Sequence, residues 1–179
     1  MPQHFETERL ILKRHTLDFA ERIFKVVDAE RSRLRQFLPW VDLTLTLEDE
    51  RNYIKSTQTR WSNFEQFDYS LFRKSDAVFL GTCGIHNISW QNERCELGYW
   101  IGTEFEGQGY ISESVKGLEG IIYDLGFHRI EIRCSVANSL SADVARRNGY
   151  SLDGTLREDS FENGTRRSTH IFAKLKTES

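Results

Sequence analysis

A glycine-rich loop precedes the clearest helical pattern in the chain, and its composition suits phosphate binding. Residues 106–112 read Glu-Gly-Gln-Gly-Tyr-Ile-Ser. The glycines permit close approach and unusual dihedral angles, and the amides of a loop that enters a helix can point into one concavity at the positive end of the helix dipole. No Lys-Ser or Lys-Thr pair follows, and the spacing differs from the dinucleotide pattern Gly-x-Gly-x-x-Gly. The loop therefore predicts a cradle for a phosphate group, with a plain turn as the alternative.

A second segment, residues 136–150, leads from an expected strand into an expected helix. It reads Val-Ala-Asn-Ser-Leu-Ser-Ala-Asp-Val-Ala-Arg-Arg-Asn-Gly-Tyr. Asn138 and Ser139 are residue types that cap the start of a helix, and Gly149 is the type that ends one. From the residues alone, simple helix capping explains this segment.

Together the two segments resemble the GNAT superfamily of N-acetyltransferases, whose cofactor loop reads Gln/Arg-x-x-Gly-x-Gly/Ala at the start of a helix. Glu106 and Ile111 stand at the outer positions of that motif, and a glutamate beside a pyrophosphate is repelled unless its side chain faces solvent. With the loop, residues 96–101 (Glu-Leu-Gly-Tyr-Trp-Ile) resemble the ribosomal-protein serine or alanine acetyltransferase branch. The resemblance extends from about Thr7 to Leu175 and implies acetyl-CoA as cofactor.

The resemblance also implies that the cofactor lies between two diverging strands, residues 95–101 and 130–136. Backbone amides of the first strand would bind the cofactor and the developing oxyanion, as preorganised donors do elsewhere. Asn138 would hydrogen-bond the pantetheine arm, Ser141 would lie near the sulfur, and one of two arginines would approach the phosphates. The expected cofactor-binding residues are Tyr99, Trp100, Ile101, Gly107, Gln108, Gly109, Tyr110, Ile111, Ser112, Asn138, Ser141, Arg146 and Arg147.

The implied reaction is direct attack of a neutral amine on the acetyl thioester, without a covalent enzyme intermediate. Removing a proton costs about 1 kcal/mol at pH 7 for an α-amine and about 5 kcal/mol for a lysine side chain, so a weak base suffices for a protein N-terminus. Glu96 is the candidate base because it shares a strand face with Gly98 and Trp100, and a surface salt bridge is its alternative. Ser141 is the candidate donor to the leaving thiolate, or else has only a structural place in its helix.

The identity of the base is open for a second reason. Some members of the resembled branch have a glutamate just before the turn that here is Asn163-Gly164, and the matching position is Ser160. Acidic residues near a turn are usually solvated. The acidic neighbours are Glu158, Asp159 and Glu162.

Other residue types that could carry chemistry have a structural explanation. Cys83, Cys95 and Cys134 lie far apart in apolar or strand-like runs without Cys-x-x-Cys spacing, so we expect buried thiols and no metal site. The histidines are scattered, and most of the aromatic residues are expected in the core.

Hydrophobic periodicity predicts the elements that must position these residues. The expected helices span residues 18–28, 31–37, 46–64, 112–125 and 139–148. The expected strands span residues 10–12, 69–72, 78–88, 95–101, 130–136, 150–156 and 169–175. This order predicts a mixed α/β (α+β) fold in one domain, residues 1–179. The resemblance implies that it is the GNAT fold, a bent, mostly antiparallel sheet of about six or seven strands flanked by helices.

Composition excludes several classes of protein. The chain has 179 residues, of which 39% are hydrophobic and 28% charged, as in an ordinary globular domain. Its net charge of −3 gives no indication of the clustered basic surface that a nucleic-acid binder needs. The N-terminal residues lack the apolar core of a signal peptide, and no run is long enough to span a bilayer, so we expect a cytoplasmic protein without membrane partners.

These observations predict an N-acetyltransferase that moves the acetyl group of acetyl-CoA to a primary amine. The favoured acceptor is the N-terminal α-amine of a protein such as a ribosomal protein. A small amine, such as an aminoacyl-nucleotide or an antibiotic, is an alternative acceptor, and a non-catalytic acyl-CoA sensor is an alternative function. A homodimer is expected by resemblance only.

Overall fold

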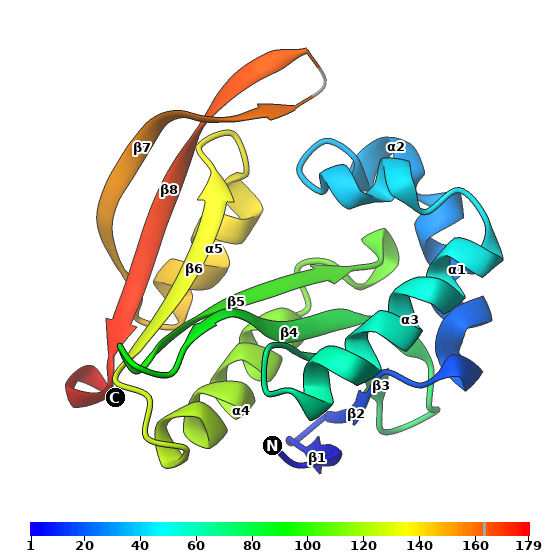
Figure 1. The fold of residues 1–179 in the computed structure, drawn as a ribbon, viewed down its shortest axis with the longest axis horizontal. Helices are drawn as coiled ribbons and strands as arrows, with labels where there is room; N and C mark the ends of the chain where they lie inside the picture. The colour runs from blue at the N-terminus through cyan, green and yellow to red at the C-terminus, as the bar shows by residue number, and fades with distance from the viewer. Residues whose placement is uncertain (163) are drawn as a thin grey trace.

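The computed structural model describes residues 1–162 and 164–179 (Figure 1). The strands are β1 (His4–Glu6), β2 (Leu10–Arg14), β3 (Phe67–Arg73), β4 (Phe79–Ser89), β5 (Arg94–Ile101), β6 (Arg129–Ser135), β7 (Ser151–Glu162) and β8 (Thr165–Leu175). The α-helices are α1 (Ala20–Ala29), α2 (Arg31–Leu34), α3 (Leu47–Ser62), α4 (Tyr110–Asp124) and α5 (Ser139–Arg147). The 3-10 turns are η1 (Leu17–Phe19), η2 (Pro39–Leu43), η3 (Thr103–Phe105) and η4 (Lys176–Glu178).

All of these strands belong to one sheet, in the order β1-β2-β3-β4-β5-β6-β8-β7. Every neighbouring pair is antiparallel except β5 and β6. This parallel pairing runs only from Arg94 opposite Arg129 to Glu96 opposite Glu131. Beyond Glu96 and Glu131 the strands diverge, so the sheet opens into two halves (Figure 1).

The predicted mixed fold with a mostly antiparallel sheet is confirmed, but the predicted number of strands is too low, because the described residues form eight. The additional strand, β1, has three residues with mainly exposed side chains, so it shows no hydrophobic alternation. β7 and β8 also extend beyond their predicted ends as a long hairpin, with a register shift between Leu156 and Ser160. Most of β7 is exposed on both faces, and such a strand lacks the alternation that marks a half-buried one.

The residues just before the two longest helices explain where these helices begin. α3 starts one residue after the predicted start at 46, because Thr46 is its N-cap and forms a reciprocal capping box with Asp49. α4 starts two residues earlier than predicted, because Gly109 adopts the left-handed conformation directly before it and Tyr110 is already buried. α2 ends at Leu34, short of the predicted residue 37.

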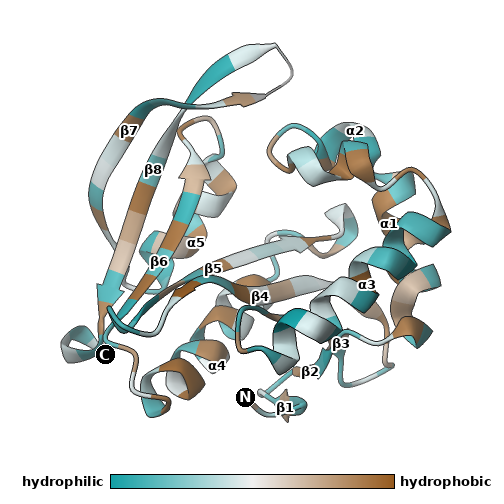
Figure 2. Cartoon of the chain, in the orientation of Figure 1, coloured by the Kyte–Doolittle hydropathy of each residue, from teal (hydrophilic) through white to brown (hydrophobic). Residues whose placement is uncertain are grey.

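Two apolar clusters cover opposite faces of the sheet (Figure 1). α4 packs on one face through Val115, Leu118 and Ile122, while α1 and α3 pack on the other through Val27 and Ile54. Burying each such side chain contributes about 1.5–3 kcal/mol. Figure 2 shows hydrophobic segments along α4 and a mainly hydrophilic α3, as expected when α4 buries the wider apolar side.

The predicted burial of Cys83, Cys95 and Cys134 is confirmed, and all are free thiols. The described part of the chain contains no group of three or more side chains arranged to hold a metal ion. Within those same residues, no helix has the length and apolar character needed to cross a membrane.

Gly109 and Gly120 provide a matched test of the helix start. Gly109→Ala should lower the free energy of unfolding by about 1 kcal/mol, because its φ of 81° is strained for any residue with a Cβ. Gly120→Ala, in the exposed middle of α4 with no atom near the added Cβ, should raise it by about 0.5–1 kcal/mol. Urea unfolding measures both, and a change of the same sign in the two variants would contradict this account of the helix start.

Candidate active site

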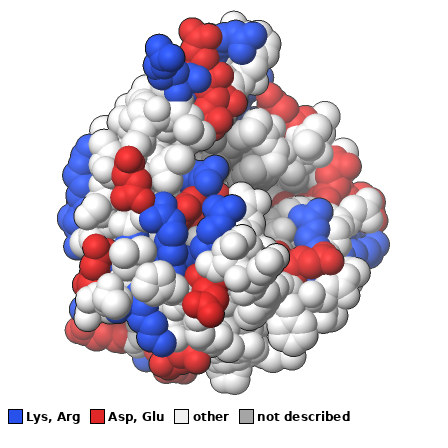
Figure 3. Space-filling view, turned by 60° about the vertical axis from the view of Figure 1, so that its left-hand side comes forward, with Lys and Arg blue, Asp and Glu red and all other residues white. Residues whose placement is uncertain are grey.

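A cavity of about 1030 Å³ lies where β5 and β6 diverge. Its walls come from these two strands, the loop before α4, the start of α5 and the segment from α2 to η2. A cavity of this size holds a ligand larger than most drug-sized molecules. On the face drawn in Figure 3, Lys and Arg side chains are interspersed with Asp and Glu rather than gathered into one basic patch.

The backbone of β5 is open on the side of the cavity. The amide of Gly102 donates to the carbonyl oxygen of Leu80 at 2.8 Å, and in an antiparallel ladder every second residue pairs in this way. The register of β4 and β5 therefore turns the amide of Trp100 toward β4 and leaves those of Tyr99 and Ile101 directed at the cavity. Of the three predicted backbone donors, two thus face the cavity and that of Trp100 faces β4.

The glycine-rich loop lines the cavity where α4 begins. Gly107 and Gly109 have φ angles of 70° and 81°, and the first-turn amides of α4 have no helical acceptor. The hydroxyl oxygen of Ser112 is buried, has no hydrogen-bond partner among the described residues, and belongs to a residue that lines the cavity. Free amides, a helix N-terminus and an unpaired hydroxyl together fit a pyrophosphate group.

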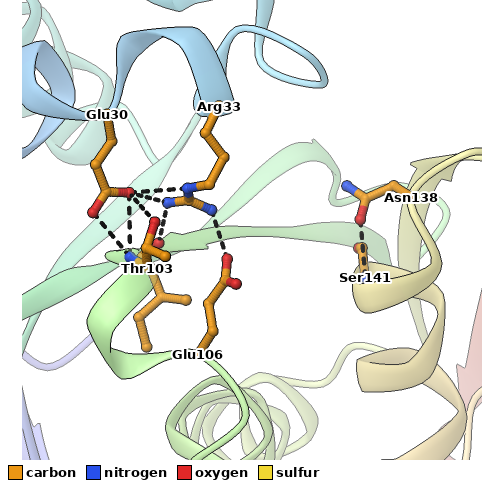
Figure 4. Close-up of polar contacts among 7 residues, drawn as sticks. Glu30, Arg33, Thr103, Glu106, Asn138 and Ser141 are labelled. Atoms are coloured by element: carbon orange, nitrogen blue, oxygen red, sulfur yellow. Dashed lines mark hydrogen bonds and ion pairs between the residues drawn. The ribbon is translucent and has the colours of Figure 1, made fainter.

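Glu106 is only partly exposed to solvent, and Arg33 of α2 binds its carboxylate. The Nη1 atom of Arg33 donates to Oε1 of Glu106 at 2.6 Å, and Nη2 donates to the carbonyl oxygen of Ile101 at 2.7 Å (Figure 4). Arg33 also pairs with Glu30, which accepts a bond from the amide of Thr103. Burial raises the pKa of Glu30, but the hydrogen bonds from Arg33 and Thr103 outweigh it and lower the pKa. The charge of Glu106 is thereby paired beside the cradle.

Arg9 supports the other side of the loop, and the sequence did not predict it. Its guanidinium lies 4.6 Å from the centre of the Tyr110 ring, donates to the carbonyl oxygen of Gln108 at 3.0 Å, and pairs with Glu113 at 2.7 Å. The side chain of Gln108 turns away to donate to the carbonyl oxygen of Glu104. Gln108 is thus a structural part of the loop, with only its backbone left for a ligand.

A pair of hydroxyl groups bridges the two halves of the sheet. The Tyr99 hydroxyl lies 3.1 Å from Oγ of Ser141, so a strand residue meets the first turns of α5 across the cavity. Burial raises the pKa of Tyr99, which keeps the hydroxyl protonated and able to donate. The sequence indicated Ser141 but assigned Tyr99 only a backbone role.

The remaining residues of the second motif divide into lining and structural positions. Asn138 caps α5 by accepting from the amide of Ser141 at 3.1 Å, and it also lines the cavity (Figure 4). Arg147 lines the cavity, whereas Arg146 pairs with Asp143 at 3.0 Å outside it. Arg147 is therefore the better placed of the two predicted arginines.

Glu96 lines the cavity and is also part of an ion-pair network, so both of its predicted interpretations have support. Its side chain is 13% exposed; Oε2 accepts from Asn87 at 2.8 Å and lies 3.6 Å from Nε of Arg133. Nε2 of His86 lies 3.6 Å from Oε1. The His86 ring covers Gly98, where an added Cβ would come within 2.8 Å of the ring. The glycine at position 98 thus makes room for an imidazole beside the candidate base.

The hairpin β7–β8 provides no described carboxylate that lines the cavity. Ser160 is half-buried opposite Arg167, and Glu158 and Asp159 are exposed. The predicted turn at residue 163 and the side chain of Glu162 lie outside the described part.

Several known proteins resemble this chain. It is 25% identical over 154 residues to the ribosomal-protein-serine acetyltransferase of Escherichia coli (strain K12), covering 86% of this chain and 85% of that protein. RimL, a ribosomal alpha-N-protein acetyltransferase solved with coenzyme A, is 24% identical with a TM-score of 0.91 and 97% of both chains covered. MccE, a microcin self-immunity acetyltransferase solved with acetyl-CoA and AMP, is 22% identical with a TM-score of 0.92, covering 98% of this chain and 97% of that one. These two structures share the fold.

Ser112→Ala should weaken binding of coenzyme A by about tenfold, because a hydrogen bond to a charged phosphate is lost. Titration calorimetry measures the dissociation constant, and Ser62→Ala, at the exposed last residue of α3 and outside the cavity lining, is the control for removing a serine hydroxyl. Equal affinities for the wild type and Ser112→Ala would place the phosphates elsewhere.

The family described as Acetyltransferase (GNAT) domain matches residues 9–151. This span contains the diverging strands β5 and β6, the glycine-rich loop, α4 and α5, which together surround most of the cavity. The chain therefore belongs to the GNAT acetyltransferase family and has its fold.

Proposed function

We propose that this acetyltransferase acts on the N-terminal α-amine of a protein, such as a ribosomal protein. The observation that carries the proposal is the single cavity that joins a phosphate cradle, free β5 amides and the polar side chains of Glu96 and His86. The Escherichia coli relative is a ribosomal-protein-serine acetyltransferase, which supports this choice of acceptor.

Acetyl-CoA supplies an activated thioester, and residues of this chain position it. Ser112 and the loop amides would hold the pyrophosphate, with Arg147 near the phosphates. The amides of Tyr99 and Ile101 would stabilise the negative charge that develops on the acetyl oxygen. The paired hydroxyls of Tyr99 and Ser141 would donate a proton to the departing sulfur.

Glu96 and His86 would accept the proton of the acceptor ammonium. His86 lies over Gly98 on the face of β5 that carries Glu96, so the pair is placed beside the open β5 amides. An α-ammonium group loses its proton at a cost of about 1 kcal/mol at pH 7, so a partly ion-paired carboxylate is a sufficient base. Deprotonating a lysine side chain would require a stronger base.

A small amine remains a second candidate acceptor, because aromatic rings also line the cavity. Phe37 and Trp40 lie on its wall between α2 and η2, where a planar group could stack. The structural neighbour MccE was solved with acetyl-CoA and AMP, and AMP contains a planar base, which supports this second candidate.

A panel of acceptors with acetyl-CoA tests the proposal. Peptides with a free N-terminus should release thiol at least about tenfold faster than the same peptides offered only through a lysine side chain, because the α-amine loses its proton more readily. Thiol release followed by a colorimetric reagent measures the rate. Turnover with small amines alone would replace the proposed acceptor by the second candidate.

Glu96→Gln and Tyr99→Phe serve as site variants in the same panel. Each should lower kcat by about a hundredfold, with affinity for coenzyme A unchanged, because each removes a proton acceptor or donor. Unchanged kcat in both variants would place the proton transfers on other residues.

A further inference from the structure

A second polar cluster lines the same cavity away from the glycine-rich loop. None of its residues was predicted to belong to the site. It comes from the start of β3, the first turns of α3 and the residue after β2. The members are His15, Glu50, Tyr53, Gln66 and Asp68. Asp68 lies on the sheet face that also carries Glu96 and His86.

Glu50 is the unusual member of this cluster. Its side chain is only 2% exposed, and Oε1 is buried with no hydrogen-bond partner among the described residues. Burial, together with the charge of Asp68, raises the pKa of Glu50 to about 7. A buried carboxylate costs free energy unless a partner compensates it.

Asp68 provides a second carboxylate without a cation. Its Oδ2 accepts bonds from the Tyr53 hydroxyl at 3.2 Å and from the Gln66 amide at 2.7 Å, which are both neutral donors. Its Oδ1 lies above Gly84, 2.4 Å from the position that a Cβ at residue 84 would occupy. The ion pairs of the described residues include none to Glu50 or Asp68.

His15 does not act as the missing cation. Its ring is 3% exposed, and Nδ1 lies 3.0 Å from Oγ of Ser70. Burial lowers the pKa of His15 and outweighs the opposing effect of Asp68, so the ring is neutral at pH 7. The pair of carboxylates therefore lacks a positive partner within its own cluster.

The sheet register gives the distance from this pair to the reaction centre. Asp68 lies opposite Gly84, and Gly84 lies opposite Gly98 of β5, next to the open amide of Tyr99. Adjacent strands are about 4.8 Å apart, so the backbone of Asp68 is roughly 10 Å from Gly98, and its carboxylate, which reaches over Gly84, is roughly 5 Å from that part of β5. One cavity contains both positions.

We propose that Glu50 and Asp68 bind a second positive charge of the acceptor, so that favoured acceptors carry a cationic group roughly 5–10 Å from the amine that is acetylated. A peptide N-terminus followed by a basic side chain, or an extended diamine, has this chemistry. The inference rests on the proposed function, since it assigns a substrate class to the same cavity. A bound cation would compensate the carboxylates that the fold leaves unpaired.

Calorimetry of the protein loaded with coenzyme A compares diaminoheptane with heptylamine, which differ only in the second charge. The wild type should bind the diamine about tenfold more tightly. Glu50→Gln and Asp68→Asn should each bring the ratio of affinities close to one. Glu48→Gln is the matched control, because Glu48 lies exposed on the same helix turn and should leave the ratio unchanged.

Affinity for coenzyme A shows that each variant is folded. If Glu50→Gln does not fold, the affinity ratio of Asp68→Asn alone tests the inference. A wild-type ratio near one, or folded variants that keep the wild-type ratio, would overturn the inference. Since no acetyl group is present, the ratio is measured without turnover. Failure of acetyl transfer in the acceptor panel therefore remains a separate result.

Discussion

The parallel pairing of β5 and β6 lasts for three residue pairs, and past Glu96 no strand of the described residues pairs with β5 on that side. Amides left without a partner in a sheet interior are costly unless water or a ligand satisfies them. The divergence also places residues from both halves of the sheet around one cavity, as the hydroxyl pair of Tyr99 and Ser141 shows. The geometry of the site thus follows from where the two strands stop pairing.

Two ion-pair networks hold the glycine-rich loop in place at the N-terminus of α4. Arg33 holds it from α2 through Glu106, and Arg9 holds it from the N-terminal strands through Glu113. Ion pairs that water still reaches each contribute little to stability, so their importance here is positional. They link segments distant in sequence and keep the amides of the loop directed at the cavity.

The local sequence pattern was sufficient to predict the helices that carry the cofactor motifs. The helix after the glycine-rich loop and the capped helix after β6 are both present, because apolar periodicity and capping are properties of adjacent residues. The long hairpin β7–β8 was not predicted at its full length, because its outer part buries neither face. The start of α4 was missed by two residues, because the conformation of Gly109 is set by the loop around it.

Within the site, the residues that escaped prediction are those that depend on distant contacts. Arg9 meets Glu113 across 104 positions, and Arg33 meets Glu106 across 73. Glu50 and Asp68 carry no motif, and only the packing of α3 on β3 brings them together in the cavity. A single sequence contains no local signal for such pairs.

Hydrogen exchange at the backbone amides of β5, with and without coenzyme A, tests the central claim most directly. The amides of Tyr99 and Ile101 and those of the loop 107–112 should exchange more slowly when coenzyme A is bound. The amide of Trp100, already paired with β4, should change little. Unchanged exchange at Tyr99 and Ile101 in the complex would contradict the account that the open edge of β5 receives the cofactor.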